Sequence, residues 1–166
     1  MKRILITGAG SYVGGSVQAH LLQWPQQYFV QTLDMIGDGW REVSFSGFDV
    51  VFHVAAIVHQ PKSKDDPAQA ELYDRVNHRL AVEVAQKANA EGVGQFVFMS
   101  SESVYGLSAA VGSTVVITKD TPLNPTDNYG ISKKKAEVQL LLVFVKQSAI
   151  LYLIHGVQRR LLLPLV

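Results

Sequence analysis

A tyrosine and a lysine placed four positions apart are the residues of this chain best suited to acid–base chemistry. Tyr129 and Lys133 begin and end the sequence YGISK. Residues four apart on a helix lie on the same face. A neighbouring ammonium favours phenolate over phenol, so we expect Lys133 to lower the pKa of Tyr129 from its usual value of about 10. Tyr129 is therefore a candidate general acid and base.

The same spacing occurs by chance on ordinary surface helices, so this pair indicates catalysis only together with other features of the chain. Ser100 and Ser101 follow a strand expected at 95–99. A serine there can hydrogen-bond a substrate oxygen and direct its proton toward Tyr129. The alternative is turn chemistry, because serine favours strand ends. We favour function because the serines, Tyr129 and a glycine-rich turn converge.

That glycine-rich turn, TGAGSYVG at 7–14, follows an apolar run and opens a helix. It fits G-x-G-x-x-G imperfectly, because the third glycine falls at position 14 and not 13. Backbone N–H groups at the start of such a helix can hold a pyrophosphate. We interpret the turn as a dinucleotide site, and not as an ordinary glycine-rich turn. Its predicted cofactor-binding residues are Gly8, Gly10, Ser11, Tyr12, Val13 and Gly14.

An acidic residue at the end of the second predicted strand favours NAD over NADP. Asp34 lies twenty residues after Gly14. There a carboxylate can accept hydrogen bonds from the adenosine ribose and would repel a 2′-phosphate. Asp38 is the alternative acid for this role. The other interpretation of Asp34 is an ordinary turn aspartate.

Two further features complete the predicted cofactor site. A strand beginning at Val50 ends in Val54, Ala55 and Ala56, whose small side chains allow a flat cofactor to lie against the backbone. Asn77, on a long helix, either holds a water or braces a backbone carbonyl beside the cofactor, or is simply an exposed polar residue. His53 is interpreted as a packed structural residue, and no histidine pair has metal-ligand spacing.

Apolar runs and turn signals alternate along the chain. Strands are expected at 4–6, 28–33, 50–55, 95–99 and 149–154, with a short edge strand at 42–45. Helices are expected at 12–24, 67–90 and 129–147. This alternation predicts an α/β fold: a Rossmann-type, doubly wound parallel sheet with helices on both faces and ligands beyond the carboxyl ends of the strands. We assign residues 1–147 to an NAD-binding domain and 148–166 to an atypical tail.

Composition excludes several other classes of protein. Hydrophobic residues make up 48% and charged residues 17%, and the formal net charge is +1, which indicates a globular chain without the basic surface of a nucleic-acid-binding protein. The absence of cysteine excludes disulfides and thiol chemistry. No apolar run reaches the roughly 20 residues of a membrane helix, and no signal peptide is evident, so a cytoplasmic location is expected.

These segments together resemble the extended short-chain dehydrogenase/reductases, specifically the NAD-dependent nucleotide-sugar epimerase/dehydratase family. The resemblance covers Lys2 to about Lys146. Besides the strand end at Asp34, the matching segments are TGAGSYVG (7–14), DVVFHVAA (49–56), VN (76–77), FVFMSSESVYG (96–106) and YGISK (129–133).

The resemblance implies a catalytic trio of Ser101, Tyr129 and Lys133. Tyr129 would deprotonate a sugar hydroxyl as hydride passes to NAD, and an epimerase would then return the hydride to the other face of the keto intermediate. Lys133 would bind the nicotinamide ribose and lower the pKa of the tyrosine, while Ser101 orients the sugar oxygen. Dehydratases of the family carry an acidic pair here, of which only Glu102 is present, so epimerase or dehydrogenase chemistry is expected. Relatives often dimerise through the helices corresponding to 67–91 and 129–147.

The end of the chain departs from this family pattern. Family members continue with an R-P-x-x-V-Y-G-like turn and a substrate domain, where this chain reads ILYLIHGVQRRLLLPLV at 150–166. We expect a truncated or frameshifted gene, altered from about Leu140 onward, with the substrate domain missing. Two functions follow as hypotheses: a nucleotide-sugar epimerase impaired by truncation, or a non-catalytic NAD-binding module.

Overall fold

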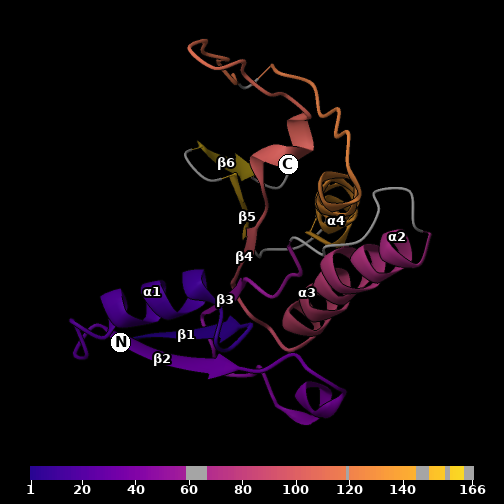
Figure 1. Ribbon diagram of the computed structural model, residues 1–166. Helices are drawn as coiled ribbons and strands as arrows, with labels where there is room; N and C mark the ends of the chain where they lie inside the picture. Colours follow the sequence, from indigo (N-terminus) through magenta and orange to yellow (C-terminus); the bar gives the residue numbers. More distant parts are fainter. Residues whose placement is uncertain (59–66, 119, 145–149, 156–157, 163–166) are drawn as a thin grey trace.

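A single mixed sheet organises the protein (Figure 1). The computed structural model describes residues 1–58, 67–118, 120–144, 150–155 and 158–162, the last two ranges by their backbone alone. Within these residues the strands lie in the order β2-β1-β3-β4-β5-β6. The first five are mutually parallel, and β6 pairs antiparallel with β5. Their bounds are β1 Lys2–Thr7, β2 Tyr28–Leu33, β3 Val50–His53, β4 Gln95–Met99, β5 Ile150–His155 and β6 Gln158–Leu162.

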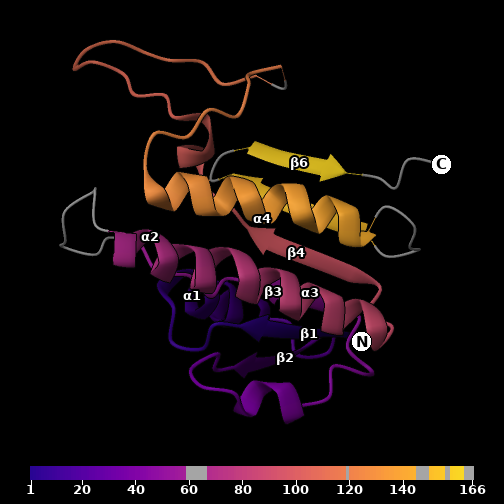
Figure 2. The ribbon, with the colours of Figure 1, turned by 90° about the vertical axis from the view of Figure 1, so that its right-hand side faces the viewer.

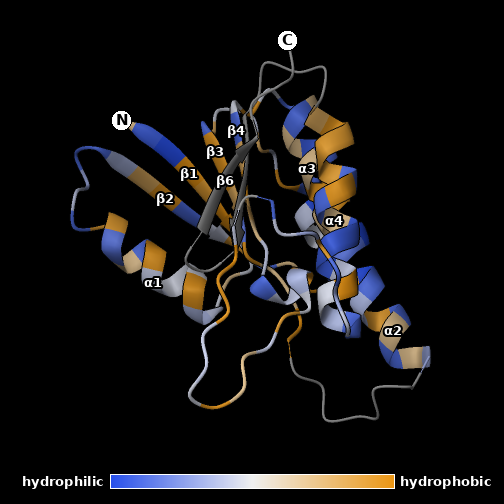
Figure 3. Cartoon of the chain, turned by 90° about the horizontal axis from the view of Figure 1, so that it is seen from above, coloured by the Kyte–Doolittle hydropathy of each residue, from blue (hydrophilic) through white to orange (hydrophobic). Residues whose placement is uncertain are grey.

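Helices cover both faces of this sheet, as Figure 3 shows along the strands. Helix α1 (Tyr12–Leu21) packs on one face. The other face carries α4 (Asn128–Phe144) beside one long helical segment made of α2 (Pro67–Tyr73), the π-helical η2 (Asp74–Arg79) and α3 (Leu80–Ala90) (Figure 2). The predicted Rossmann-type, doubly wound fold is therefore confirmed.

Two apolar cores explain why the central strands are apolar along their whole length. Side chains alternate between the faces of a strand. Leu5, Val51 and Phe96 belong to the core under α3 and α4. The alternate residues Ile6 and Phe52 belong to the core that packs against α1 residues. A strand buried on both faces needs apolar residues at every position.

The chain changes direction between β1 and β3, which is where open α/β sheets hold their ligands. Gly8 follows β1 here with φ +111°. A Cβ at this position would lie 2.7 Å from the backbone nitrogen of Ala55. The N–H groups of Val54 and Ala55 donate to the Thr7 carbonyl, each at 3.0 Å. Glycine is thus required for the turn and for the approach of the two chain segments.

Several predicted elements differ from the structure. The edge strand expected at 42–45 is wrong: the chain forms a 3₁₀ helix at Gly39–Glu42. The physical reason is that the Phe45 side chain is buried and its N–H donates to Glu91, so this backbone anchors the loop and does not pair with a strand. Strand β6 and the π-helical segment were not expected. The predicted end of α4 at 145–147 lies outside the described residues.

None of the helices in the described part of the chain is long and apolar enough to cross a membrane. The same part contains no group of three or more His, Asp or Glu side chains that could hold a metal ion.

We predict that Gly8→Ala strongly destabilises the fold. The substitution combines a left-handed backbone, which costs about 1–2 kcal/mol, with overpacking, which costs about 1–3 kcal/mol. Urea unfolding should show this loss. Gly15→Ala is the matched control, because no heavy atom lies within 4 Å of its Cβ position and it sits inside α1. That control should gain up to about 1 kcal/mol. Equal stability of the two variants would contradict the prediction.

Candidate active site

The predicted catalytic residues meet at the carboxyl edge of the sheet. Ser101 follows β4 and forms the N-cap of a 3₁₀ helix, η3 (Glu102–Tyr105), by accepting a hydrogen bond from the Ser103 N–H at 3.2 Å. The first turn of α4, which carries Tyr129, packs against η3, since a Cβ at Gly130 would overlap the Ser103 carbonyl. Tyr73 of α2 packs edge-on against the tyrosine ring, at 6.2 Å between ring centroids. Serine and tyrosine are thus held together by segments far apart in the sequence.

Lys133 lies one turn further along α4 and is 1% exposed. Its ammonium donates to the Met99 carbonyl at 2.8 Å and lies 4.6 Å from the centroid of the Phe98 ring. The distance to the Tyr129 ring centroid is 6.0 Å. Burial lowers the pKa of Lys133 to about 7, although the negative charge of Glu137 raises it. Lys133 is therefore close to the point where it can gain or lose a proton at neutral pH.

The expected lowering of the Tyr129 pKa is wrong for this structure. Burial raises the pKa of the phenol, and the charges of Asp127 and Tyr73 act in the same direction. The Ser101 side chain acts to lower this pKa, without overcoming the effect of burial. Removing the phenol from water therefore has the larger effect on this pKa. The Lys133 ammonium does not offset it, because it is directed at the Met99 carbonyl.

The glycine-rich turn has the geometry of an anion site. Ser11 is the N-cap of α1 and accepts from the Gly14 N–H at 3.1 Å. A Cβ at Gly14 would lie 3.1 Å from Val54, so this glycine allows α1 to pack closely on the sheet. Around Gly10 there is open space, while Tyr12 and Val13 are exposed. The first N–H groups of a helix have no partner within the helix, and Ser11 takes only that of Gly14, so the amides of Tyr12 and Val13 suit a phosphate.

The two candidate acids near β2 differ in their contacts. Asp34 is exposed just after the strand, and its carboxylate accepts from the Ile36 N–H at 3.0 Å. Asp38 instead forms an ion pair with Arg41. Asp34 stands at the carboxyl end of the strand next to the glycine turn, where an adenosine ribose would lie.

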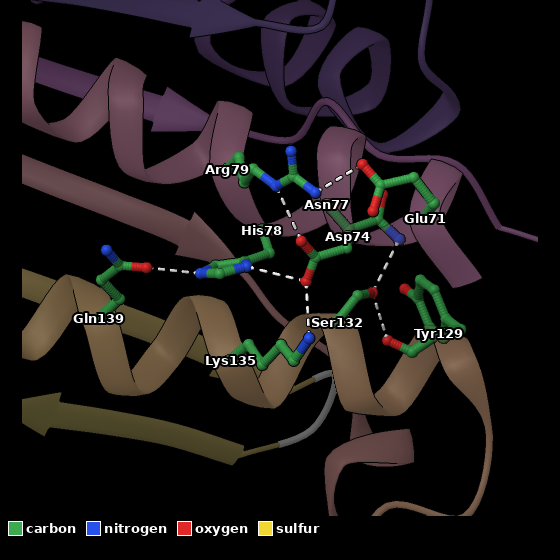
Figure 4. Close-up of polar contacts among 9 residues, drawn as sticks. All are labelled: Glu71, Asp74, Asn77, His78, Arg79, Tyr129, Ser132, Lys135 and Gln139. Atoms are coloured by element: carbon green, nitrogen blue, oxygen red, sulfur yellow. Dashed lines mark hydrogen bonds and ion pairs between the residues drawn. The ribbon is translucent and has the colours of Figure 1, made fainter. Parts of the chain in front are cut away.

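Asn77 joins the wall of the predicted cofactor site to helix α4 (Figure 4). Its side chain accepts from the Ile57 N–H at 2.8 Å and donates to the Ile57 carbonyl at 3.0 Å. It also donates to the Ser132 hydroxyl at 3.2 Å, which in turn donates to the Tyr129 carbonyl at 2.7 Å. The alternative that Asn77 is exposed is wrong, since it is fully buried. It holds the segment that follows Val54, Ala55 and Ala56.

An ionic cluster fixes the same two helical segments from the outside (Figure 4). The Asp74 carboxylate accepts from Lys135 and Arg79, both at 2.8 Å, and pairs with His78 at 3.1 Å. Burial alone would raise the pKa of Asp74, but these hydrogen bonds outweigh it and lower the pKa. Asp74 and Asn77 both belong to the π-helical segment, so one irregular turn contacts α4 through two different networks.

Sequence reasoning missed two residues that support this site, Ser132 and Glu137, and did not predict the contact that Ser100 makes. The sequence contained a signal for both missed residues. Ser132 directly precedes Lys133, and Glu137 follows it by one helical turn, so both belong to the same part of α4. The hydroxyl of Ser100 donates to the buried Glu137 carboxylate, and burial of a carboxylate cannot be deduced from a polar residue in a helix pattern.

Fold and site define the class first: a dinucleotide-binding α/β protein with a serine, a tyrosine and a lysine at the sheet edge. Residues 4–149 match the model of the NAD dependent epimerase/dehydratase family. The chain belongs to this family, as the sequence resemblance indicated. The family is NAD-dependent by its description, which confirms NAD as the expected cofactor at the level of the family.

Individual relatives agree with this assignment. The chain is 32% identical to a UDP-glucose 4-epimerase of Vibrio cholerae, with 84% of this chain and 46% of the relative covered. It is 36% identical to a UDP-glucose 4-epimerase of Lactobacillus helveticus, with 82% and 45% covered. The chain thus spans about half the length of the curated relatives it matches.

Among solved structures, a short-chain dehydrogenase/reductase superfamily protein from Agrobacterium tumefaciens with bound NAD has a TM-score of 0.76. It is 25% identical to this chain, and the match covers 92% of this chain and 48% of that one.

We predict that Asn77→Leu destabilises the protein, because it leaves the N–H and carbonyl of Ile57 without their partner. Each unsatisfied group costs about 1–3 kcal/mol, so with two such groups urea unfolding should show a loss of about 2–6 kcal/mol. Gln86→Ala, at an exposed position of α3, is the control and should change stability by less than about 0.5 kcal/mol. A loss no larger than that of the control would refute a bracing role for Asn77.

Proposed function

We propose that this chain binds NAD and carries the catalytic residues of a nucleotide-sugar epimerase or dehydrogenase. The observation that carries the proposal is the convergence of Ser101 and Tyr129 at the edge of the sheet, where η3 packs against the first turn of α4 and Lys133 lies one helical turn away. The family assignment and the UDP-glucose 4-epimerases among the relatives support a nucleotide sugar as substrate. Glu102 is exposed and Ser103 stands where a second acid would be, so dehydration is the less favoured reaction.

The proposed cofactor contacts follow the edge of the sheet. The pyrophosphate would lie against the turn from Gly8 to Gly14, on the amides at the start of α1, and the adenosine ribose on the Asp34 carboxylate. Val54, Ala55 and Ala56 would form the wall of the site, braced by Asn77. The open space at Gly10 and the exposed start of α1 fit a phosphate group.

The three catalytic side chains have separate roles in this proposal. Ser101 hydrogen-bonds the reacting hydroxyl of the sugar and aligns it with Tyr129. Tyr129 accepts the hydroxyl proton and later returns it. When bound, NAD supplies the hydride acceptor. Lys133, whose ammonium donates to the Met99 carbonyl and lies 6.0 Å from the Tyr129 ring centroid, would hold the ribose hydroxyls and favour the phenolate over the phenol.

Calorimetry with NAD and NADP, followed by turnover of UDP-sugars, tests this function. NAD should bind more tightly than NADP, and Asp34→Asn should reduce this preference, whereas Asp38→Asn should leave it unchanged. Tyr129→Phe should retain NAD affinity while turnover falls about 10²–10⁴-fold, as expected on removing a general acid and base. Tyr28→Phe, a tyrosine of β2, is the matched control.

Each outcome of these measurements has a clear meaning. NAD binding without turnover of any UDP-sugar would contradict the enzyme and support the NAD-binding module. Absence of NAD binding would contradict both.

We also propose a homodimer through the helices at 67–91 and 129–147. Ile131, Val138 and Leu142 leave apolar surface exposed along α4, with Leu142 72% exposed. Burying such a stripe in a symmetric interface would stabilise the dimer. Val138→Asp should therefore shift the sedimenting species from dimer to monomer, whereas Val116→Asp, on an exposed loop, should not. A wild-type chain that sediments as a monomer at all concentrations would refute the dimer.

A further inference from the structure

A polar cluster lies buried between the sheet and α4, within a core that is otherwise apolar. Its members, each at most 4% exposed, are Thr7, His53, Ser100, Lys133 and Glu137. Two of them are groups that carry charge in water. Buried charges are costly unless they are paired and hydrogen-bonded. The burial of Lys133 and Glu137 on the same helix therefore requires a physical reason.

Glu137 is placed to act as the counter-charge of Lys133. It follows the lysine by four residues on α4, so both side chains belong to the same helix face. The Ser100 hydroxyl, at the end of β4, donates to the Glu137 carboxylate. The negative charge of Glu137 raises the pKa of Lys133, against the larger effect of burial.

His53 of β3 faces the lysine from the sheet and cannot take this role. Its Nδ1 lies 2.8 Å from the Thr7 hydroxyl, and its ring stacks near Phe96 and Phe98. Burial lowers the pKa of His53 to about 3, and the charge of Lys133 acts in the same direction, so the imidazole is neutral at physiological pH. Within the described residues, the titratable groups that face the ammonium are thus Glu137, Tyr129 and His53.

We propose that Glu137, held in place by Ser100, is a positioning residue that favours the protonated form of Lys133 at the end of β4. This deepens the proposed function and rests on it, because the charge of Lys133 matters for catalysis only if Tyr129 is the acid and base. A neutral Lys133 would bind ribose hydroxyls less strongly and would not stabilise the phenolate.

The direct readout is the titration of Lys133 itself. ¹³C-lysine NMR of the whole chain, assigned with Lys133→Met, follows its protonation without requiring turnover. Glu137→Gln keeps the shape of the side chain and removes its charge. It should lower the titration midpoint of Lys133 by about one to three pH units, the range that one neighbouring charge produces. The alkaline limb of the turnover profile should move to lower pH in the same variant.

Matched variants separate charge from packing. Ser100→Ala should shift the midpoint in the same direction by a smaller amount, and Ser100→Thr, which keeps the hydroxyl, should restore it. Glu83→Gln removes a carboxylate that pairs with Arg41 on the outside of α3 and should leave the titration midpoint of Lys133 unchanged.

If Glu137→Gln fails to fold, the comparison of Ser100→Ala with Ser100→Thr decides. A midpoint in Glu137→Gln equal to that in Glu83→Gln, or no difference between Ser100→Ala and Ser100→Thr, would overturn the proposal. Failure of the wild type to bind NAD or turn over UDP-sugars would refute the proposed function, and the Lys133 titration would still stand as measured.

Discussion

Burial of the Lys133 ammonium beside the end of β4 constrains the active edge of this protein more than any other contact. An ammonium removed from water must find acceptors, and the Met99 carbonyl provides one at 2.8 Å. Because Lys133 is on α4 and Met99 ends β4, this bond fixes α4 on the strand that directly precedes the serines. Tyr129, one turn earlier on the same helix, is thereby brought to the serine. Burying this charge costs free energy, and the contact that reduces the cost also fixes the geometry of the sheet edge.

The cofactor side of the site is held by different means. Gly8 allows the segment after β1 to approach the segment after β3, and Asn77 then binds both backbone groups of Ile57. Asn77 reaches inward from a π-helical turn whose Asp74 bonds outward to α4. π-helical turns often occur at functional sites, and here the irregular turn connects the cofactor wall with the catalytic helix. The two halves of the site are therefore mechanically linked through Ser132.

Sequence alone was sufficient for the five parallel strands of the sheet, because continuous apolar runs and glycine turns indicate strands buried on both faces. It also predicted that Ser101, Tyr129 and Lys133 lie at the same edge of the sheet, Ser101 from the family resemblance and the other two from their spacing on a helix. Sequence reasoning failed for properties that depend on which side chains are buried in the fold. The pKa of Tyr129 depends on desolvation, which a one-turn spacing to Lys133 does not reveal. The predicted strand at 42–45 is wrong because the contact of Phe45 with Glu91 joins residues 46 positions apart, which a local pattern does not reveal. The π-helical turn has no sequence signal of its own.

The most direct test of the central claim is a crystal structure of this chain with NAD. The account predicts the pyrophosphate on the turn from Gly8 to Gly14 and the nicotinamide ring beside the Tyr129 phenol. It also predicts that the Lys133 ammonium contacts the nicotinamide ribose. A dinucleotide bound elsewhere, or a nicotinamide ring separated from Tyr129 by the Ile57 segment, would contradict it.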